Sequence, residues 1–471
     1  MIFKQFYLAC LAHASYLIGD EETGTAVAVD PQRDVDQYIA FAAEHALTIK
    51  HVILTHLHAD FVAGHLELRD RVGATIYLGA AAKAAYPFTP LHDGDVLEFG
   101  RVRLKALETP GHTPESISIV IYDRNTSDTR PYGVLTGDTL FVGDVGRPDL
   151  LERAANQQGT MEGMARKLFQ SLKATTDLPD YLQLWPGHGA GSSCGRELGA
   201  LPSTTLGFER VANWAFQFHD ENSFVEEVLS GQPEPPGYFA RMKTVNRSGP
   251  PPLPSLAPIR EVGAHQIQDA FHTGVTVVDV RSSASFAAGH IPGTMSIPMG
   301  TSLATWAGTF VPESRDIVLI TDDDDRLSRA RHTLALIGLD RVVAWAGQRA
   351  LDEWQSEIGE LERVEQVSVD AIANGDERTV IDVRGNAEWE EGHLPNARHY
   401  FLGDLVRQAR DLPHDTPIAV HCHGGTRSSV AASLLQAQGF TNVANMSGGY
   451  RAWTEANKPV ERDEAHADVP K

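Results

Sequence analysis

The sequence predicts a multidomain α/β protein. Apolar runs typical of buried strands alternate with helical segments, and a proline-rich segment divides the chain of 471 residues near its middle. In the second half, two blocks of sequence recur about 100 residues further on. Hydrophobic residues make up 42% of the chain and charged residues 22%, so each domain can bury a core of ordinary size.

The first half begins with strands. Residues 1–19 contain short apolar stretches, but Lys4, Gln5 and His13 interrupt them, so we expect paired strands and no leader peptide. Period and composition predict further strands at 25–30, 50–56, 101–107, 117–122 and 181–185, and helices at 34–45, 160–172 and 221–229. No apolar run reaches the roughly 18 residues that a membrane-spanning helix needs.

The proline-rich segment SGPPPLPSLAP predicts a semi-rigid linker, because proline fits neither a helix interior nor a central strand. After it, VVDVRSSASFAAGHIPG resembles VIDVRGNAEWEEGHLPN, and residues 317–339 resemble residues 418–440. Each copy alternates strands and helices, which predicts two domains with parallel sheets. The predicted boundaries are 1–247, a linker at 248–259, then 260–361 and 362–471.

Charge and cysteine content limit the partners and the compartment. A net charge of −22 repels phosphate backbones and anionic lipids, so we expect neither nucleic acid nor membrane as a partner. Three cysteines exclude a disulfide-rich secreted scaffold and predict a reducing, cytoplasmic location. The oligomeric state stays open, with a homo-oligomer as one alternative.

Four segments predict a metal site in the first half. THLHAD follows an apolar strand and supplies His56, His58 and Asp60. His112 in TPGHT, Asp138 in LTGDT and His188 in WPGHG follow other extended segments, each beside a glycine that permits a tight turn. A single histidine is usually a surface or core residue, but four such segments together indicate metal ligation.

These segments resemble the metallo-β-lactamase superfamily, with its HxHxDH motif and later His, Asp and His ligands. The resemblance implies an αββα sandwich for the first domain. The last histidine of the motif is replaced by Phe61, which cannot coordinate a metal. The resemblance therefore argues against a two-metal hydrolase of the glyoxalase II kind. His65 lies four residues further on, and we expect it to face elsewhere.

Within the superfamily, the sequence resembles the persulfide dioxygenases, which implies one Fe(II) per chain, with zinc or manganese as substitutes in recombinant protein. The implied ligands are His56, His112 and Asp138, a set that suits Fe(II) because it leaves coordination positions open. The groups implied to orient these ligands are His58, Asp60 and His188. Arg147 is implied to bind the substrate carboxylate, with a structural ion pair to Asp144 or Asp149 as the alternative. Gly189 and Ala190 stand where these dioxygenases often carry a tyrosine, which leaves the substrate open.

The loop HCHGGTRSS predicts a second reactive site. Cys422 follows a strand and precedes a helix, where backbone N–H groups stabilise a thiolate. The loop resembles rhodanese active sites, which implies that Cys422 carries sulfane sulfur and Arg427 closes the loop. The implied substrate-binding residues are His423, Gly424, Gly425 and Thr426. The Cys-x4-Arg spacing is one residue shorter than that of Cys-x5-Arg phosphatases, and an inert buried cysteine is the alternative.

The first repeat places Thr321 where the second has Cys422, followed by four aspartates, 322–325. That copy has no nucleophile, so we expect it to be catalytically silent, with cation binding by the aspartates as the weaker alternative. Cys194 lies six residues after His188, and we expect a buried thiol there rather than a reactive one.

Together these features predict an enzyme of sulfur metabolism. The metal domain would oxidise a low-molecular-weight thiol persulfide with dioxygen to sulfite. Cys422 would transfer sulfane sulfur to and from small partners such as thiosulfate. One alternative is a thioester hydrolase fused to a sulfurtransferase. Another is a non-catalytic sulfur sensor or carrier, against which the complete ligand set argues.

Overall fold

The computed structural model describes residues 1–153 and 158–462. The chain forms two compact units, Met1–Pro254 with Leu336–Gly338, and Ser255–Ala335 with Leu339–Lys471. The main boundary therefore falls inside the proline-rich segment. Residues 463–471 of the predicted last domain lie outside the described residues.

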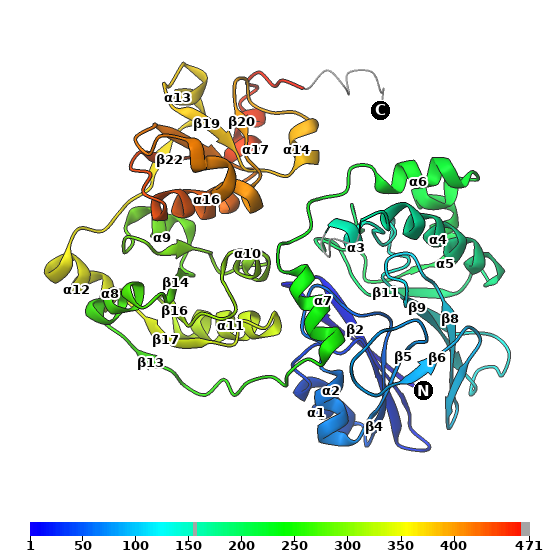
Figure 1. The fold of residues 1–471 in the computed structure, drawn as a ribbon. Helices are drawn as coiled ribbons and strands as arrows, with labels where there is room; N and C mark the ends of the chain where they lie inside the picture. Colours follow the sequence, from blue (N-terminus) through cyan, green and yellow to red (C-terminus); the bar gives the residue numbers. More distant parts are fainter. Residues whose placement is uncertain (154–157, 463–471) are drawn as a thin grey trace. The chain divides into compact units, whose positions relative to one another are not determined.

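The first unit contains two six-stranded sheets (Figure 1). The first sheet has the order β1(Ile2–Leu8), β2(His13–Asp20), β3(Thr25–Val29), β4(Thr48–Leu54), β5(Thr75–Gly79) and β6(Thr89–Leu91). The second has the order β12(Thr204–Thr205), β11(Gln183–Pro186), β10(Gly133–Gly137), β9(Ile117–Asp123), β8(Val102–Glu108) and β7(Val96–Phe99). The predicted strands are all present, with ends shifted by a few residues.

The two sheets pack face to face. One buried cluster joins side chains of both sheets, including Tyr16, Val27, Ile53, Leu104, Ile119 and Leu135. A second cluster joins the outer face of the second sheet to α4(Met161–Ala174) and α6(Glu221–Leu229). The helices α1(Asp36–Glu44) and α2(His65–Val72) contact β4 of the first sheet. The remaining helices are α3(Leu150–Arg153), α5(Leu206–Ala212) and α7(Phe239–Ser248). This arrangement is the predicted αββα sandwich.

The second unit contains two five-stranded sheets, each with all its strands parallel. The first has the order β13(Arg260–Glu261), β17(Val342–Ala346), β16(Ile317–Ile320), β14(Thr276–Asp279) and β15(Met295–Ser296). The second has the order β18(Glu365–Val367), β22(Val443–Met446), β21(Ile418–His421), β19(Thr379–Asp382) and β20(Arg398–His399). Because the two orders correspond strand for strand, the sequence repeat reflects a duplicated α/β domain, as predicted.

Helices complete each copy. The first copy has α8(Ala264–His272), α9(Ser283–Ala288), α10(Leu303–Phe310), α11(Asp324–Leu336) and α12(Gln348–Glu353). The second has α13(Val369–Ala373), α14(Asn386–Glu390), α15(Leu405–Gln408), α16(Thr426–Ala437) and α17(Gly449–Glu455). Both copies bury one ion pair after the second strand. Arg281 pairs with Asp279 and Arg384 with Asp382, at 2.7 Å in each case. The pair is present in the copy without a cysteine, so it supports the fold rather than the chemistry.

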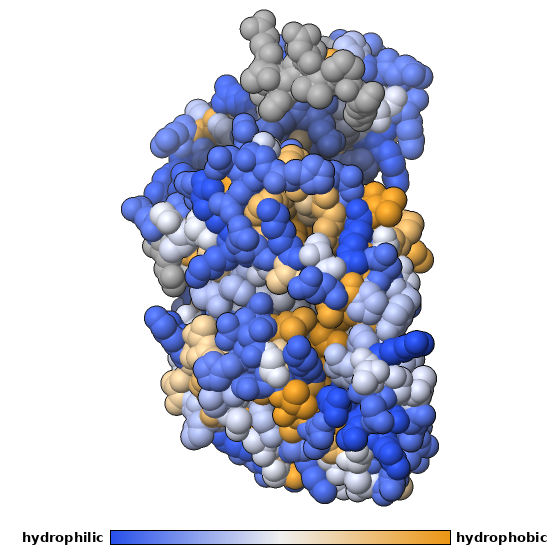
Figure 2. Space-filling model, turned by 90° about the vertical axis from the view of Figure 1, so that its right-hand side faces the viewer, coloured by the Kyte–Doolittle hydropathy of each residue, from blue (hydrophilic) through white to orange (hydrophobic). Residues whose placement is uncertain are grey.

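Among the described residues, no helix is both long and apolar enough to cross a membrane. The face drawn in Figure 2 is mostly hydrophilic, with apolar residues in small separate patches. This surface agrees with the net charge of −22.

Candidate metal centre and sulfur-transfer loop

The predicted metal ligands lie at the ends of three strands, one from the first sheet and two from the second. His56 follows β4, His112 follows β8, and Asp138 directly follows β10. All three side chains are almost fully buried. The strand ends converge because the two sheets pack face to face, so residues far apart in the sequence meet at one point.

The three side chains point their free atoms at one another. Nε2 of His112 lies 3.5 Å from Oδ2 of Asp138, and Nε2 of His56 lies 3.8 Å from the same oxygen. That oxygen has no hydrogen-bond partner among the described residues. All three ligand atoms lie within 4.8 Å of one another. A buried carboxylate oxygen without a donor is costly unless a cation binds it, so the arrangement fits a metal ion.

Hydrogen bonds fix the orientation of both imidazoles. Nδ1 of His112 donates to the backbone oxygen of Arg147 at 3.0 Å, since a carbonyl can only accept. Nδ1 of His56 lies 3.0 Å from Oγ1 of Thr55, whose hydroxyl donates to Asp30 at 2.8 Å. The proton of each ring therefore sits on Nδ1, which leaves the Nε2 lone pairs available for a metal.

His188 bridges two carboxylates. Its Nδ1 lies 2.8 Å from Oδ1 of Asp138, and its Nε2 lies 2.9 Å from Oδ2 of Asp60. Burial alone would lower the pKa of His188, but the carboxylates of Asp138 and Asp60 raise it to about 10. His188 therefore donates to both partners and holds Asp138 with its second oxygen directed at His56 and His112.

His58 takes a supporting position. Its Nε2 lies 3.0 Å from Oδ1 of Asp30, the residue that also accepts from Thr55. Burial opposes its charge, but Asp30 raises the pKa of His58 overall. The carboxylate of Asp30 therefore accepts from Thr55, which orients His56, and also holds His58 in place.

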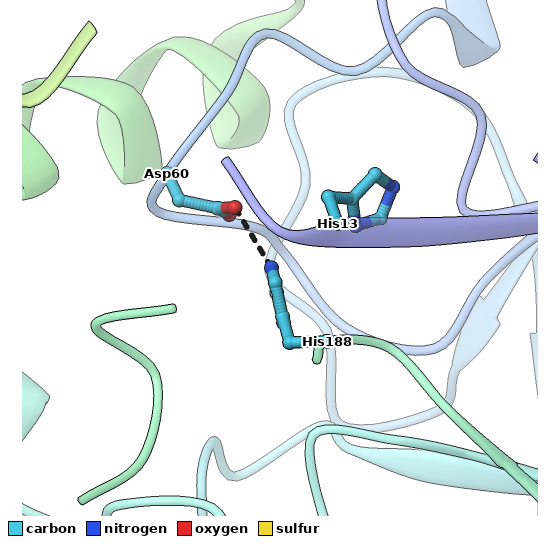
Figure 3. A group of neighbouring side chains, drawn as sticks. All are labelled: His13, Asp60 and His188. Atoms are coloured by element: carbon cyan, nitrogen blue, oxygen red, sulfur yellow. Dashed lines mark hydrogen bonds and ion pairs between the residues drawn. The ribbon is translucent and has the colours of Figure 1, made fainter. Parts of the chain in front are cut away.

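A second group of side chains lies beside this centre (Figure 3). His13, Asp60 and His188 also place one possible ligand atom each within 4.8 Å. Phe61 is fully buried, with its ring 4.2 Å from that of His13 and 4.6 Å from that of His58. His13 lies outside every motif of the sequence, so no local pattern predicts its position beside the metal centre. Only the fold pairs its backbone with that of His188.

Arg147 forms the ion pair with Asp149 that the structural alternative expects. It is fully buried, and its Nε and Nη2 donate to the two oxygens of Asp149 at 2.8 and 2.7 Å. Its Nη1 donates to the backbone oxygen of Ser193. Each of its three nitrogens thus makes one hydrogen bond inside the protein, and the binding of a substrate carboxylate by Arg147 stays a prediction.

Two further residues, His65 and Cys194, differ in how close they lie to the candidate metal centre. His65 opens α2 and packs against Tyr86, 4.8 Å between ring centroids, outside the candidate ligand groups. Cys194, in contrast, groups with Asp138 and His188. Burial, reinforced by Asp138 and Asp60, raises the pKa of the Cys194 thiol well above its usual range, so it remains protonated.

The Cys422 loop forms a cradle at the start of α16. Sγ of Cys422 accepts from the backbone N–H of Gly425 at 3.0 Å and lies 3.5 Å from Oγ of Ser428. Gly425 has φ +115°, which turns its N–H back toward the sulfur. The loop thus offers the sulfur a backbone N–H donor and a nearby hydroxyl, and the role of Cys422 as a carrier of sulfane sulfur stays a prediction.

A second glycine supports this loop from behind. A Cβ at Gly449 would lie 2.3 Å from the backbone oxygen of Cys422, so only glycine permits this approach. The backbone oxygens of Cys422 and His423 accept from the N–H groups of Tyr450 and Arg451. Arg427 pairs with Glu388 of α14, with Nη2 2.8 Å from Oε1, and so closes the loop against its own domain.

The first copy lacks this chemistry. Thr321 is fully buried at the position of Cys422. The aspartates that follow pair with arginines of α11, Asp322 with Arg326 and Asp325 with Arg329. None of the candidate metal groups found among the described residues includes them.

Comparison with known proteins agrees with this geometry. The sequence model of the metallo-beta-lactamase superfamily matches residues 8–188. A crystal structure of a metallo-beta-lactamase from Staphylococcus aureus subsp. aureus COL is 40% identical, covers 74% of this chain and 99% of its own, and superposes with a TM-score of 0.68. The chain belongs to the metallo-beta-lactamase superfamily. The rhodanese-like domain model matches residues 263–357 and 366–456, so this member of the superfamily carries two rhodanese-like domains.

Curated relatives of the metallo-beta-lactamase domain include a hydrolase and a dioxygenase. A cytoplasmic hydroxyacylglutathione hydrolase of Arabidopsis thaliana is 35% identical over 39% of this chain and 67% of its own length. The mitochondrial persulfide dioxygenase ETHE1 of Bos taurus is 29% identical over 37% of this chain and 63% of its own length. The chain thus spans about two thirds of the length of these relatives.

Proposed function

We propose that this protein oxidises a low-molecular-weight thiol persulfide with dioxygen and transfers sulfane sulfur through Cys422. The donor set of the metal centre carries the proposal. Two imidazoles and one carboxylate converge there, with one unpartnered carboxylate oxygen. The matches to rhodanese-like domains and to a persulfide dioxygenase within the metallo-beta-lactamase superfamily support a role in sulfur metabolism, without naming the reaction.

The residues that would hold the metal are His56, His112 and Asp138. Such a set suits Fe(II), because three ligands leave adjacent positions open. When bound, the iron would supply the activation of dioxygen and of the persulfide sulfur. Phe61 favours one metal over two, since it occupies the place of a ligand in the family motif and cannot coordinate.

The surrounding residues would keep the three ligand side chains in a single orientation. His188 keeps Asp138 in position, and Thr55 and the backbone of Arg147 fix the two imidazole rings. Burial of all three ligands excludes bulk water. The chain thereby provides the oriented, water-poor surroundings that limit hydrolysis of a reactive sulfur intermediate.

The rhodanese-like site would work by transfer without net oxidation. The Cys422 thiolate attacks the outer sulfur of a persulfide R–S–SH, a sulfur–sulfur bond forms to Cys422, and the bond to R–S breaks. R–S⁻ leaves and Cys422 carries the persulfide. A nucleophile such as cyanide then takes the outer sulfur as thiocyanate and restores the thiolate. The backbone N–H of Gly425 would stabilise the thiolate, because it donates to Sγ of Cys422.

Dioxygen uptake by iron-loaded protein given glutathione persulfide tests the proposal. We expect uptake with formation of sulfite and glutathione, and a loss of at least about a hundredfold in Asp138→Ala. Gly163→Ala is a matched control, because a Cβ at Gly163 on α4 meets no atom within 4 Å. Absence of uptake in wild-type protein with a full iron load would refute the dioxygenase assignment.

Thioester hydrolysis is the second candidate, favoured by the group of His13, Asp60 and His188 and by the hydroxyacylglutathione hydrolase relative. A second metal in that group would restore a two-metal site. S-lactoylglutathione turnover distinguishes the candidates. Efficient hydrolysis that is lost in His13→Gln, without oxygen uptake from persulfide, would replace the first proposal by the second.

A further inference from the structure

The second unit contains a cavity of about 490 Å³ between its two rhodanese-like domains. One part of its lining comes from Gly424, Gly425 and Thr426 of the Cys422 loop. Another part comes from α9 of the silent first copy, through Ala284, Ala287 and Ala288. The cavity thus joins the reactive loop to a domain that has no nucleophile of its own.

The contact between the two copies is specific. Oγ of Ser433, on α16, accepts from the backbone N–H of Ser296 in β15 at 2.9 Å. The hydroxyls of Ser296 and Ser429 lie 3.1 Å apart, and all three serines are buried. Because α16 begins at the Cys422 loop, these bonds hold the silent copy against the helix that positions the sulfur. In Figure 1, α9 and α16 lie side by side.

The lining of the cavity is small and uncharged. Among the described residues that line it, none carries a charged side chain. The alanines of α9 and Val364 supply apolar surface, while Gln366, Asn445 and Ser447 supply neutral polar groups. Nδ2 of Asn445 donates to Gln366 at 2.9 Å, and its Oδ1 has no partner among the described residues.

The uncharged lining favours some sulfur compounds over others. Thiosulfate is a dianion, and outside the Cys422 loop the lining has no charged side chain to offset the cost of removing it from water. An uncharged organic thiol with an amide group matches better, because alkyl carbons fit the alanines and a neutral amide suits the uncharged polar side chains of the lining. Both glycines of the loop border open space, since a Cβ at Gly424 or Gly425 would meet no atom within 4 Å.

We propose that this cavity binds the neutral, amide-bearing organic part of a thiol persulfide and that α9 of the silent copy forms its wall. The inference rests on the proposed sulfur transfer through Cys422 and names the substrate class of that site. The first rhodanese-like domain then serves as a specificity element for the second. Thiosulfate would reach the loop without using the apolar wall.

Ala284→Phe tests the inference, because Ala284 is exposed on α9 and a larger side chain there fills the cavity. The donors are N-acetylcysteamine persulfide and thiosulfate, with cyanide as acceptor. We expect KM for the persulfide to rise about tenfold with little change in kcat, and thiosulfate kinetics to change less than about twofold. Ser314→Phe, at an exposed position of the same domain outside the lining, should behave as wild type.

Binding of an unreactive probe separates this inference from the proposed function. S-methyl-N-acetylcysteamine should show contact with wild-type protein and with Cys422→Ser in ligand-observed NMR, and contact should be lost in Ala284→Phe. Equal impairment of both donors, or unchanged probe binding in Ala284→Phe, would overturn the cavity assignment. Transfer activity that persists in Cys422→Ser would instead overturn the role of Cys422, while the binding result would still stand on its own.

Discussion

At the scale of single residues, the metal centre depends on how each atom is partnered. Asp138 uses one oxygen for His188 and leaves the other unpaired between two imidazole nitrogens. Arg147 and Cys194 lie close by, but the first is fully engaged by Asp149 and the second is protonated. Proximity to the centre therefore does not by itself indicate a role in the reaction.

Asp138→Ala should abolish metal binding. The substitution removes the unpartnered oxygen and leaves only two imidazole ligands, so metal content should fall from about one per chain to less than about 0.2. Elemental analysis of freshly purified protein measures this. Wild-type protein with two tightly bound metals would contradict the one-metal proposal, and a return to one metal in His13→Gln would locate the second.

We expect the stability of the protein to depend on pH through His290. Its ring is buried and stacks on the ring of Phe286, and burial lowers the pKa of His290 to about 4. Below about pH 6.5 the imidazole of His290 takes up a proton in the unfolded chain but stays neutral in the folded protein. The unfolding free energy is therefore highest above pH 6.5 and falls as the pH drops toward 4.

Urea unfolding at pH 7 and pH 5 measures this effect. Wild-type protein should lose about 2 kcal/mol more than His290→Gln over this interval, by the linkage of a single group. Glutamine keeps a donor for the backbone oxygen of Phe286 but does not titrate. Parallel losses in the two proteins would show that His290 is not the group responsible.

At the scale of elements, short loops after strands carry both sites. Gly146 lies in the loop that returns past Asp138, and a Cβ there would be 1.7 Å from the backbone oxygen of Asp138 and 3.1 Å from Cβ of His112. The same principle operates at Gly449 beneath the Cys422 loop. Glycine in these loops allows backbone segments to approach closely enough to fix reactive side chains.

Gly146→Ala should therefore damage the metal centre without touching a ligand. The methyl group must displace the backbone of Asp138, at a cost of about 2–4 kcal/mol in unfolding free energy and with a clear loss of metal affinity. Gly163→Ala on α4 is the control and should leave metal affinity near wild type, with the unfolding free energy unchanged or raised by up to about 1 kcal/mol, because alanine favours a helix. Metal titration and thermal unfolding of the two variants provide the comparison.

Sequence patterns predicted the strands, helices and domains more fully than they predicted which side chains contact each other. The family resemblance carried by THLHAD, TPGHT and LTGDT was enough to name three residues that the fold brings together, and the internal repeat was enough to predict two parallel sheets. The sequence around Arg147, in contrast, is the same whether the arginine faces a substrate or Asp149. His13 and the wall formed by α9 have no local signal, because their positions arise from strand pairing and from packing between domains.

At the scale of the whole molecule, one chain combines a metal centre and a sulfur-transfer loop in separate units. Thiosulfate with a thiol should drive oxygen uptake only if both sites work, since Cys422 must first generate the persulfide. Cys422→Ser should abolish this coupled uptake and all thiosulfate:cyanide transfer, because an alcohol cannot carry sulfane sulfur and the first copy has no cysteine.

The same variant should keep its oxygen uptake with preformed glutathione persulfide. Oxygen-electrode traces with the two substrate mixtures separate the outcomes. Loss of both activities in Cys422→Ser would indicate that the transfer loop is required for oxidation itself. Mass spectrometry after treatment with a sulfur donor should find the added sulfur on Cys422, and its appearance mainly on Cys194 would contradict the assignment.

The buried ion pair shared by the two rhodanese-like copies has a consequence for stability. Arg281 and Asp279 have the same 2.7 Å geometry as Arg384 and Asp382. Removal of either partner would leave the other charge buried without compensation, at a cost of about 3–5 kcal/mol in unfolding free energy. Each copy therefore depends on its own pair for folding, whether or not it carries a cysteine.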